Sequence, residues 1–485
     1  MTSHDERKDI IIKVFAGAGL RLTGFILTRL LGIIRIIVFA RLFLPDELGT
    51  AILATSCISI ASLFTNFGFY QSVIRHKAGL ADFINTAFTL SVMIGFVVFL
   101  LTSIGAPIFS LVFSKDLDKY IIFLAFLVFA TPLKFPNALW ERNFKFTQPI
   151  VASLIGECAI LIISIFTEYF FHLEIWSLLI GNLGGFFISV IYIWFKTDYR
   201  PKLTIKHEHT KPLFSFGTPF MLQSINGEVM ARGDNLMVGA FWSSTQLAYY
   251  NFAWQVPMLI SSLTASMDSI LLPVYARLNK DRLAILRLFN LSNKMWSITG
   301  SFWGFFIFLY CEHIVHIIYG PNWKPVVPIL QIMTISFVIR FCSGYSYDNL
   351  VLARGRTKYM MKWGFVNTIL VFTLGLYLIK KMGPIGGAWF WLMQSIILIP
   401  LVRLPLIYQE LQSFEFIRHV WQPFFSGLVA LFFSYMLKGL IYQSIYLNLG
   451  LGIIMYGFIY CATLFFCDKN LIADVKKIII IVKTR

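Results

Sequence analysis

Charged residues are scarce in this sequence. Only 13% of its 485 residues are Asp, Glu, Lys or Arg, whereas 58% are hydrophobic. Because a soluble globular chain carries roughly 25% charged residues, this composition excludes a water-soluble fold. The 49 Phe, 20 Tyr and 12 Trp residues are typical of lipid-facing surfaces and of the aromatic belts at membrane interfaces. We therefore predict a polytopic membrane protein.

Patterns of metal-ligating residues are also lacking. The six cysteines contain no CxxC pair and lie mostly inside apolar runs, where cysteine acts as a small packing residue. His207 and His209 lie in the longest basic connection, but no further cysteine or histidine nearby completes a zinc ligand set. We expect no metal ion and no cofactor.

Catalytic motifs are missing too. The sequence has no GxxxxGK[ST] phosphate loop, no GxSxG and no HExxH. No connection between the apolar runs is long enough to form the polar domain that a membrane glycosyltransferase or ligase normally needs. We therefore expect that the protein is not an enzyme.

The apolar runs predict an all-α protein with about fourteen membrane helices. The predicted spans are 14–39, 50–70, 83–109, 120–139, 150–171, 175–195, 214–241, 247–275, 285–310, 326–352, 359–379, 385–407, 421–440 and 445–466. With both termini in the cytoplasm, the inside connections and the C-terminal tail hold most of the lysines and arginines, as the positive-inside rule requires. Basic cytoplasmic loops thus explain the net charge of +17. Nucleic acid is not an expected partner, since no basic soluble domain is present.

The two halves of the chain resemble each other weakly. FA at 39–40, followed by LGTA at 48–51, is similar to a pattern about 200 positions later. That pattern is GA at 239–240, followed by LAYY at 247–250. A displacement of six helices keeps the orientation, so the pattern predicts two lobes related by an axis along the membrane normal. We predict a six-helix lobe over 1–205, a second over 206–410, and a further helix pair with a basic cytoplasmic tail over 411–485.

The stretch from Ser215 to Phe241 is long enough to cross a bilayer, yet it carries several strongly polar side chains. They are Gln223, Asn226, Glu228, Arg232, Asp234 and Asn235. One charge near the centre of a membrane helix costs roughly 2.5–3.5 kcal/mol, so we expect these groups to face protein or a water-filled cavity. Glu228 and Arg232 stand four positions apart and can pair on one helix face. Two interpretations stay open for them: an ion pair that only holds helices in place, or a role in substrate binding.

Three arginines interrupt the first apolar run: Arg21, Arg29 and Arg35. At 100° per residue, Arg21 and Arg35 fall with small residues within an arc of about 80°. Those small residues are Gly17, Gly24, Thr28 and Gly32. Snorkelling to the nearest membrane surface explains Arg21 and Arg35, but it does not explain Arg29 near mid-depth. We favour a cationic strip that faces a cavity.

Other ionisable residues lie inside predicted spans. We expect Lys294 and Arg340 to line the cavity or to join the two lobes, and we expect Glu157, Glu228, Asp234 and Asp268 to couple ion movement or to pair with cations. Guanidinium groups bind phosphate oxygens with two parallel hydrogen bonds and stay charged at physiological pH. The predicted substrate-binding cavity is lined by Arg21, Arg29, Arg35, Arg232, Lys294 and Arg340. Such a lining favours an anionic, phosphorylated substrate.

Five sequence blocks also resemble a known family. They are RLFLPDELGTAILATSCISIASLFTNFGFYQSVIRHK at 41–77, the block ARGDNLMVGAFW to LLPVYARL at 231–278, IIYGPNWKPVVPILQI at 317–332, LARGRTKY at 352–359 and MGPIGGAW at 382–389. In this order they resemble the polysaccharide transporter branch, the Wzx-type oligosaccharide flippases, of the multidrug/oligosaccharidyl-lipid/polysaccharide exporter superfamily. The resemblance covers most of the chain up to about residue 410.

This resemblance implies an inner-membrane protein that exports a polyprenyl-diphosphate-linked oligosaccharide by alternating access, for surface or exopolysaccharide biosynthesis. It implies two six-helix lobes, two further helices, a cationic central cavity and coupling to an ion gradient. The expected partners are the anionic lipid-linked oligosaccharide, membrane lipids and the polysaccharide polymerase machinery. Two alternatives stay open: an ion-coupled multidrug or cation exporter of the same superfamily, and a non-transporting scaffold of a glycan-synthesis complex. For the flippase, we predict that Arg29→Ala or Arg232→Ala abolishes surface polysaccharide.

Overall fold

The described part of the chain is almost entirely helical. The computed structural model describes residues 23–76, 80–113, 116–278, 281–438 and 445–468, and no β-strand occurs within them. The first helix covers residues 23–42. The others in the N-terminal half are α2 (Pro45–Asn66), α3 (Phe69–Arg75), α4 (Leu80–Phe113), α5 (Asp118–Ala130), η1 (Thr131–Lys134), α6 (Pro136–Arg142), α7 (Thr147–Phe171), α8 (Ile175–Lys196) and α9 (His207–Phe241).

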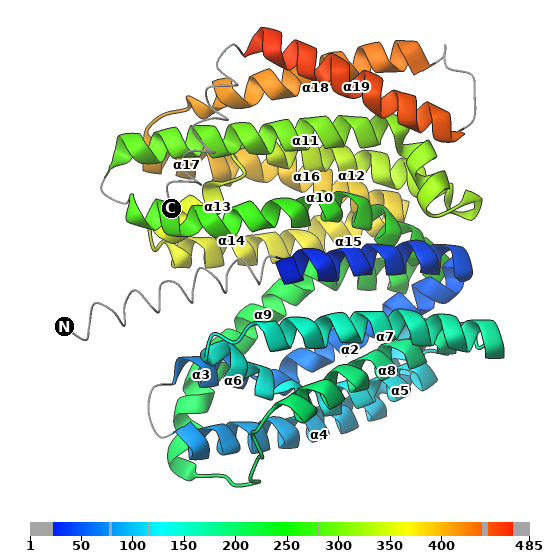
Figure 1. The fold of residues 1–485 in the computed structure, drawn as a ribbon, viewed down its shortest axis with the longest axis vertical. Helices are drawn as coiled ribbons and strands as arrows, with labels where there is room; N and C mark the ends of the chain where they lie inside the picture. Colours follow the sequence, from blue (N-terminus) through cyan, green and yellow to red (C-terminus); the bar gives the residue numbers. More distant parts are fainter. Residues whose placement is uncertain (1–22, 77–79, 114–115, 279–280, 439–444, 469–485) are drawn as a thin grey trace. The chain divides into compact units, whose positions relative to one another are not determined.

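The C-terminal half continues in the same way (Figure 1). Its elements are α10 (Ser244–Arg277), α11 (Arg282–Ile318), η2 (Pro321–Trp323), α12 (Val326–Phe341), α13 (Tyr347–Ala353), α14 (Thr357–Leu370), η3 (Val371–Gly375), α15 (Leu376–Met382), α16 (Pro384–Leu398), η4 (Ile399–Arg403), α17 (Leu404–Leu411), α18 (Phe416–Lys438) and α19 (Ile445–Cys467). The elements η3 and η4 are π-helical turns that join α14 to α15 and α16 to α17.

The predicted fold class is confirmed, but the predicted number of membrane helices is not. Among the described residues, ten helices are long and apolar enough to cross a membrane, and α12 is a shorter apolar helix. The helices α9 and α10 lie at predicted spans but are not among the ten. Both are richer in polar residues than α4 or α7, so apolarity alone does not mark them as spans. The protein is a multi-pass membrane protein.

Local sequence signals set the helix ends. In α2, Pro45 lies in the first turn, where a backbone N–H has no partner within the helix, so the N–H that proline lacks is not needed. The Glu47 carboxylate accepts a hydrogen bond of 2.8 Å from the backbone N–H of Leu44, just before the helix. The helix ends where Phe67 and Gly68 adopt positive φ angles of 40° and 69°. At α11, the Asp281 side chain accepts a hydrogen bond of 3.0 Å from the Ala284 N–H and so caps the helix.

By its internal contacts, the chain divides into two compact units, Met1–Ala248 and Tyr249–Arg485. In the first unit, α7 packs along α8, α4 along α5, and α2 against α5 and α9. Small residues let α7 and α8 approach closely, since a Cβ built on Gly181 would meet the Ser164 hydroxyl at 1.9 Å. Helix α9 thus packs within the first unit. The lobe boundaries at 205/206 and 410/411 stay a prediction.

In the second unit, α11 is the central helix. It packs against α12, α18 and α19, and α12 in turn packs against α16. Aromatic side chains fill these contacts, with Trp296 and Phe341 at a centroid distance of 6.0 Å and Phe302 and Tyr460 at 5.2 Å. Figure 1 shows α18 and α19 lying side by side. The final helix pair is therefore packed into the second unit.

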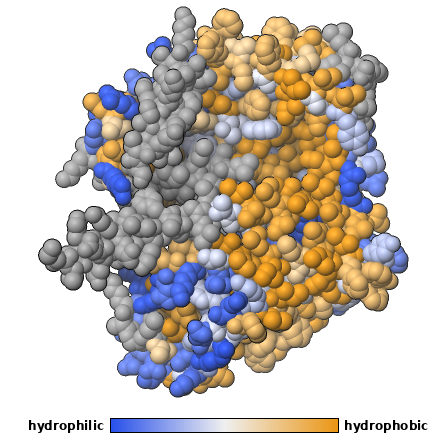
Figure 2. Space-filling model, viewed as in Figure 1, coloured by the Kyte–Doolittle hydropathy of each residue, from blue (hydrophilic) through white to orange (hydrophobic). Residues whose placement is uncertain are grey.

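Hydrophobic residues cover a broad area of the face shown in Figure 2. Large hydrophobic residues such as Leu111, Phe195 and Phe466 are more than 80% exposed. In water such a surface drives aggregation, whereas in a bilayer it is matched by lipid tails. The large hydrophobic residues that are exposed on the surface are therefore the ones that face the membrane lipid.

We predict that Gly49→Ala destabilises the first unit. A Cβ at Gly49 would lie 1.8 Å from the backbone oxygen of Ser244, and Asp46 binds the Ser244 hydroxyl across the same contact at 2.5 Å. Backbone must then shift, at a cost of roughly 1–3 kcal/mol. The measurement is the thermal unfolding midpoint of the detergent-purified protein. Gly105→Ala in α4 is the matched control, because its Cβ would meet nothing within 4 Å, and equal midpoints for the two variants would contradict the prediction.

Candidate functional site

Three of the predicted cavity cations form ion pairs with carboxylates. Arg35 on the helix over 23–42 lies 2.9 Å from a Glu157 carboxylate oxygen on α7, and both side chains are about a quarter exposed, at 27% and 25%. This contact joins two helices that are far apart in sequence. The same pair brings together one predicted substrate-binding cation and one predicted coupling carboxylate.

The pair expected from the spacing of α9 is present. The Arg232 Nε donates a hydrogen bond to the Glu228 carboxylate, one helical turn earlier. Asp234 is buried and its carboxylate accepts a hydrogen bond of 2.8 Å from the Asn235 N–H. Glu228 and Arg232 therefore compensate each other's charge within α9.

Lys294 forms the most buried ion pair among the described residues. Its ammonium group contacts the Asp468 carboxylate, and the two side chains are only 2% and 6% exposed. Lys294 lies on α11, whereas Asp468 directly follows the last residue of α19. The pair fastens the end of the final helix to the centre of the second unit.

Arg29 differs from these three cations. Its side chain is exposed, and its guanidinium carbon lies 5.3 Å from the centroid of the Phe25 ring, one turn earlier. No carboxylate within the described residues lies within ion-pairing distance of it. Arg21 falls outside the described residues, and the side chain of Asp268 is likewise not described.

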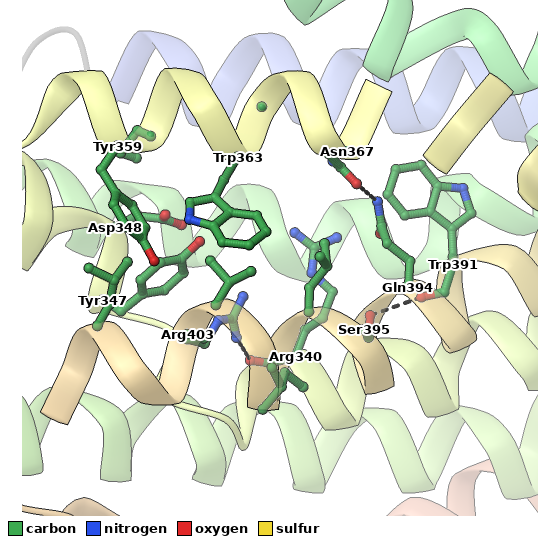
Figure 3. A pocket seen from close by; sticks show the side chains of 16 residues that line it. Arg340, Tyr347, Asp348, Tyr359, Trp363, Asn367, Trp391, Gln394, Ser395 and Arg403 are labelled. Atoms are coloured by element: carbon green, nitrogen blue, oxygen red, sulfur yellow. Dashed lines mark hydrogen bonds between the residues drawn. The ribbon is translucent and has the colours of Figure 1, made fainter. Parts of the chain in front are cut away.

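Arg340 lines a pocket in the second unit. The pocket has a volume of about 260 Å³ and is lined by residues of α12, α13, α14, α16, η4 and α17. Figure 3 shows the side chains of Arg340, Arg403 and Trp363 pointing into this space. The polar and aromatic lining consists of Arg340, Tyr347, Asp348, Tyr359, Trp363, Asn367, Trp391, Gln394, Ser395 and Arg403.

The two arginines of this pocket have different surroundings. Arg403 donates to the Arg340 backbone oxygen at 3.0 Å and to the Ser343 hydroxyl at 2.5 Å, and its guanidinium lies 4.6 Å from the Tyr347 ring centroid. The Arg340 guanidinium makes no hydrogen bond or ion pair with any residue that the structure describes. Arg403 is therefore anchored by two hydrogen bonds to protein, whereas the Arg340 guanidinium has no such anchor among the described residues.

Arg340 also borders a second, more apolar pocket of about 210 Å³. Its walls include Trp254, Met258, Phe337 and Tyr345. The Trp254 and Trp391 rings lie 4.9 Å apart between their centroids, and Trp391 Nε1 donates to the Tyr250 hydroxyl at 3.1 Å. One guanidinium thus faces two neighbouring aromatic-lined spaces.

The sequence interpretation missed two residues of these arrangements. Arg403 was a charge inside the predicted span 385–407, which was the available signal. Asp468 carried no local signal, because its partner lies on a distant helix. The predicted cations therefore separate into Arg35, Arg232 and Lys294, which pair with carboxylates, and Arg29 and Arg340, which do not pair with any described carboxylate.

Comparison with known proteins identifies the family. The family described as polysaccharide biosynthesis protein matches residues 38–328, more than half of the chain. The chain belongs to this polysaccharide biosynthesis family. The resemblance found in the sequence blocks is thereby confirmed.

Two curated members of the wider group are similar over most of their length. The lipopolysaccharide biosynthesis protein WzxC of Escherichia coli K12 is 23% identical over 427 residues, which cover 84% of each chain. The teichuronic acid biosynthesis protein TuaB of Bacillus subtilis is 20% identical over 373 residues, which cover 75% of this chain and 76% of TuaB.

Solved structures share the fold of this polysaccharide biosynthesis protein. The lipid II flippase MurJ in its inward closed conformation matches with a TM-score of 0.75 and 18% identity, covering 93% of this chain and 99% of MurJ. An inward-facing multidrug resistance MATE transporter matches with a TM-score of 0.62 and 13% identity, covering 80% and 98%. At such identities the likeness shows the fold alone.

We predict that the Arg232–Glu228 pair can be removed as a unit. Arg232→Ala leaves an unpaired carboxylate in a membrane helix and is expected to reduce folded protein and transport together. Adding Glu228→Gln is expected to restore both, because the uncompensated charge is gone. The measurements are the yield of monodisperse purified protein and surface polysaccharide. A double variant that folds but does not transport would instead place Arg232 in contact with substrate.

Proposed function

We propose that this protein is a flippase that moves a polyprenyl-diphosphate-linked oligosaccharide across the cytoplasmic membrane by alternating access. The product of this step serves surface or secreted polysaccharide synthesis. The protein acts as a transporter and not as an enzyme. Membership in the polysaccharide biosynthesis family supports the substrate class, and the MurJ-like fold supports the transport architecture.

One observation supports the proposal more than any other. Arg29 and Arg340 lie within the predicted membrane spans 14–39 and 326–352, and neither has a carboxylate partner among the described residues. An unpaired cation in a membrane protein is costly unless a ligand or water compensates it. An anionic lipid-linked oligosaccharide carries negatively charged oxygens, on its diphosphate and on any acidic sugar, and guanidinium groups bind such oxygens with two parallel hydrogen bonds.

The same arginines argue against export of organic cations. A cationic drug gains nothing from a guanidinium and is repelled by it, since like charges in a low-dielectric site cost several kcal/mol. Arg340 lines both of the pockets described above. The non-transporting scaffold does not account for these arginines either, because a scaffold has no use for an unpaired charge in the membrane.

We place the protein in the inner membrane with both termini in the cytoplasm. The excess of lysine and arginine in the inside connections supports this orientation. The division into lobes at 1–205 and 206–410, with an additional helix pair at 411–485, belongs to the same proposal. The polysaccharide polymerase machinery is the proposed protein partner.

Reconstitution tests the proposal. The full chain is placed in proteoliposomes with a fluorescent lipid-diphosphate oligosaccharide, and an impermeant quencher reports the fraction of label in the outer leaflet. We expect flipping well above that of protein-free vesicles, and a change in rate when a proton or sodium gradient is applied. Flipping no faster than in protein-free vesicles, together with uptake of an organic cation, would reject the proposal.

A further inference from the structure

We infer that the pocket at Arg340 binds one carboxylate-bearing sugar of the transported glycan, a uronic acid residue. The pocket is thereby a specificity site, and Arg29 is left as the cation proposed to bind the diphosphate. This inference rests on the proposed flippase function, because the glycan it describes is the cargo of that function. The inference states that the transported glycan contains an acidic sugar.

The charge of the pocket fits a single negative charge. Its lining contains two guanidinium groups, on Arg340 and Arg403, and one carboxylate, on Asp348, which leaves one net positive charge (2 − 1 = 1). One carboxylate neutralises this charge. A diphosphate diester carries two negative charges, so it overcompensates the pocket and is repelled by Asp348.

The Arg340 guanidinium supplies the binding geometry. Arg403 is anchored through its Nη1, which donates to the Arg340 backbone oxygen and to the Ser343 hydroxyl, so it contributes charge and shape. Arg340 keeps a planar fork of donors that matches the two oxygens of a carboxylate. The π-helical turn η4 carries both Ile399 and Arg403 into the pocket wall, and such turns frequently occur at functional sites.

Unused hydrogen-bonding groups in the same pocket fit sugar hydroxyls. The Trp363 Nε1–H is buried and donates to no group within the part of the chain that the structure describes. The Gln394 amide donates to the Asn367 oxygen, which leaves the Asn367 amide donors and the Gln394 oxygen without a described partner. These groups offer both donors and an acceptor, as a ring bearing several hydroxyls requires.

The size and walls of the pocket also fit one sugar ring. Its volume of about 260 Å³ lies below the roughly 300–1,000 Å³ of sites that take drug-sized ligands. It is too small for a whole oligosaccharide repeat. The indole rings of Trp363 and Trp391 and the ring of Tyr359 line it (Figure 3), and such flat apolar faces pack against the C–H face of a pyranose.

Binding to the purified full chain is the first test. Saturation-transfer NMR measures the Kd of methyl β-glucuronide, methyl β-glucoside and inorganic diphosphate. We expect the glucuronide to bind at least tenfold more tightly than either other probe, and Arg340→Gln to weaken it by about tenfold or more. Trp363→Phe keeps the ring but removes the unused donor, and is expected to weaken glucuronide binding while the protein stays folded.

Arg418→Gln is the matched control, because Arg418 is an exposed arginine of the same unit that does not line the pocket. It is expected to bind glucuronide as the unaltered protein does. Diphosphate that binds as tightly as glucuronide, or an Arg340→Gln variant with unchanged Kd, overturns the inference. Trp363→Phe alters the same pocket, so it still tests the inference if Arg340→Gln does not fold. Unchanged glucuronide binding by a folded Trp363→Phe variant would then count against the inference.

Transport separates this inference from the proposed function. Proteoliposomes receive a lipid-diphosphate oligosaccharide that contains a glucuronate, or the same molecule after its carboxyl group is reduced to the alcohol. We expect the acidic form to flip about tenfold faster, and Arg340→Gln to remove this preference. Equal flipping of both forms by the unaltered protein overturns the pocket assignment and leaves the flippase standing. Flipping of neither form rejects the flippase, and the binding experiment then decides the pocket on its own.

Discussion

Replacing Arg29 by alanine is expected to abolish transport of the lipid-linked oligosaccharide while the protein still inserts and folds. Arg29 is exposed, contacts the Phe25 ring, and has no carboxylate partner among the described residues. Its loss therefore leaves no buried charge behind. Hydrogen bonds to a charged group contribute roughly 1.5–3 kcal/mol each, so a bidentate contact to a diphosphate accounts for a decrease in flipping rate of about 100-fold or more.

Two neighbouring variants make this result interpretable. Leu27→Ala changes a side chain that is 50% exposed on the same helix, and it is expected to flip substrate at the normal rate. Arg29→Lys keeps the charge but not the planar fork, so it is expected to retain only part of the rate. The measurement is the flipping rate per folded protein in proteoliposomes. A normal flipping rate in the Arg29→Ala variant would show that Arg29 does not bind the substrate.

The second large effect is expected at Lys294. Lys294→Met leaves the Asp468 carboxylate buried without its counter-ion, and losing one partner of a buried pair costs roughly 3–5 kcal/mol. We expect a strongly lowered unfolding midpoint in detergent and a low yield of folded protein. Asp468→Asn is expected to have an effect of similar size, because it removes the carboxylate charge that pairs with the buried Lys294 ammonium.

The double variant Lys294→Met, Asp468→Leu completes this cycle. It is expected to recover most or all of the lost stability, since replacing both members of a buried ion pair by apolar residues is often neutral or stabilising. Stability losses that simply add would show that the pair is not coupled. A stable double variant that no longer flips lipid-linked oligosaccharide would return Lys294 to the set of substrate-binding cations.

These expectations change how the predicted cationic cavity is understood. The sequence interpretation placed six cations in the lining of one cavity and left open which of them form ion pairs, whereas the structure pairs Arg35 with Glu157, Arg232 with Glu228 and Lys294 with Asp468. A paired cation has its charge satisfied, so it stabilises packing more readily than it binds a second anion. Arg29 and Arg340 are left as the stronger candidates for substrate contact. Glu157 and Glu228 act first as the partners of arginines.

The sequence by itself determined the features that depend on composition and on spacing within one helix. Scarce charge and long apolar runs established a helical multi-pass membrane protein, because a single long apolar run in lipid satisfies its own backbone hydrogen bonds only as a helix. The Glu228–Arg232 pair followed from a separation of four residues. Five short blocks between 41 and 389 were enough to indicate the family.

Only the tertiary structure decided which of the intramembrane charges have partners. Arg35 and Lys294 meet carboxylates on other helices, and no spacing along the chain records which helices pack together. The π-helical turn at Ile399–Arg403 directs Arg403 into a pocket that α12, α13, α14 and α16 complete. Pairing across helices depends on three-dimensional packing. In the sequence Lys294 and Arg340 look the same, each a cation inside a predicted span. In the structure Lys294 pairs with Asp468, whereas Arg340 has no carboxylate partner among the described residues.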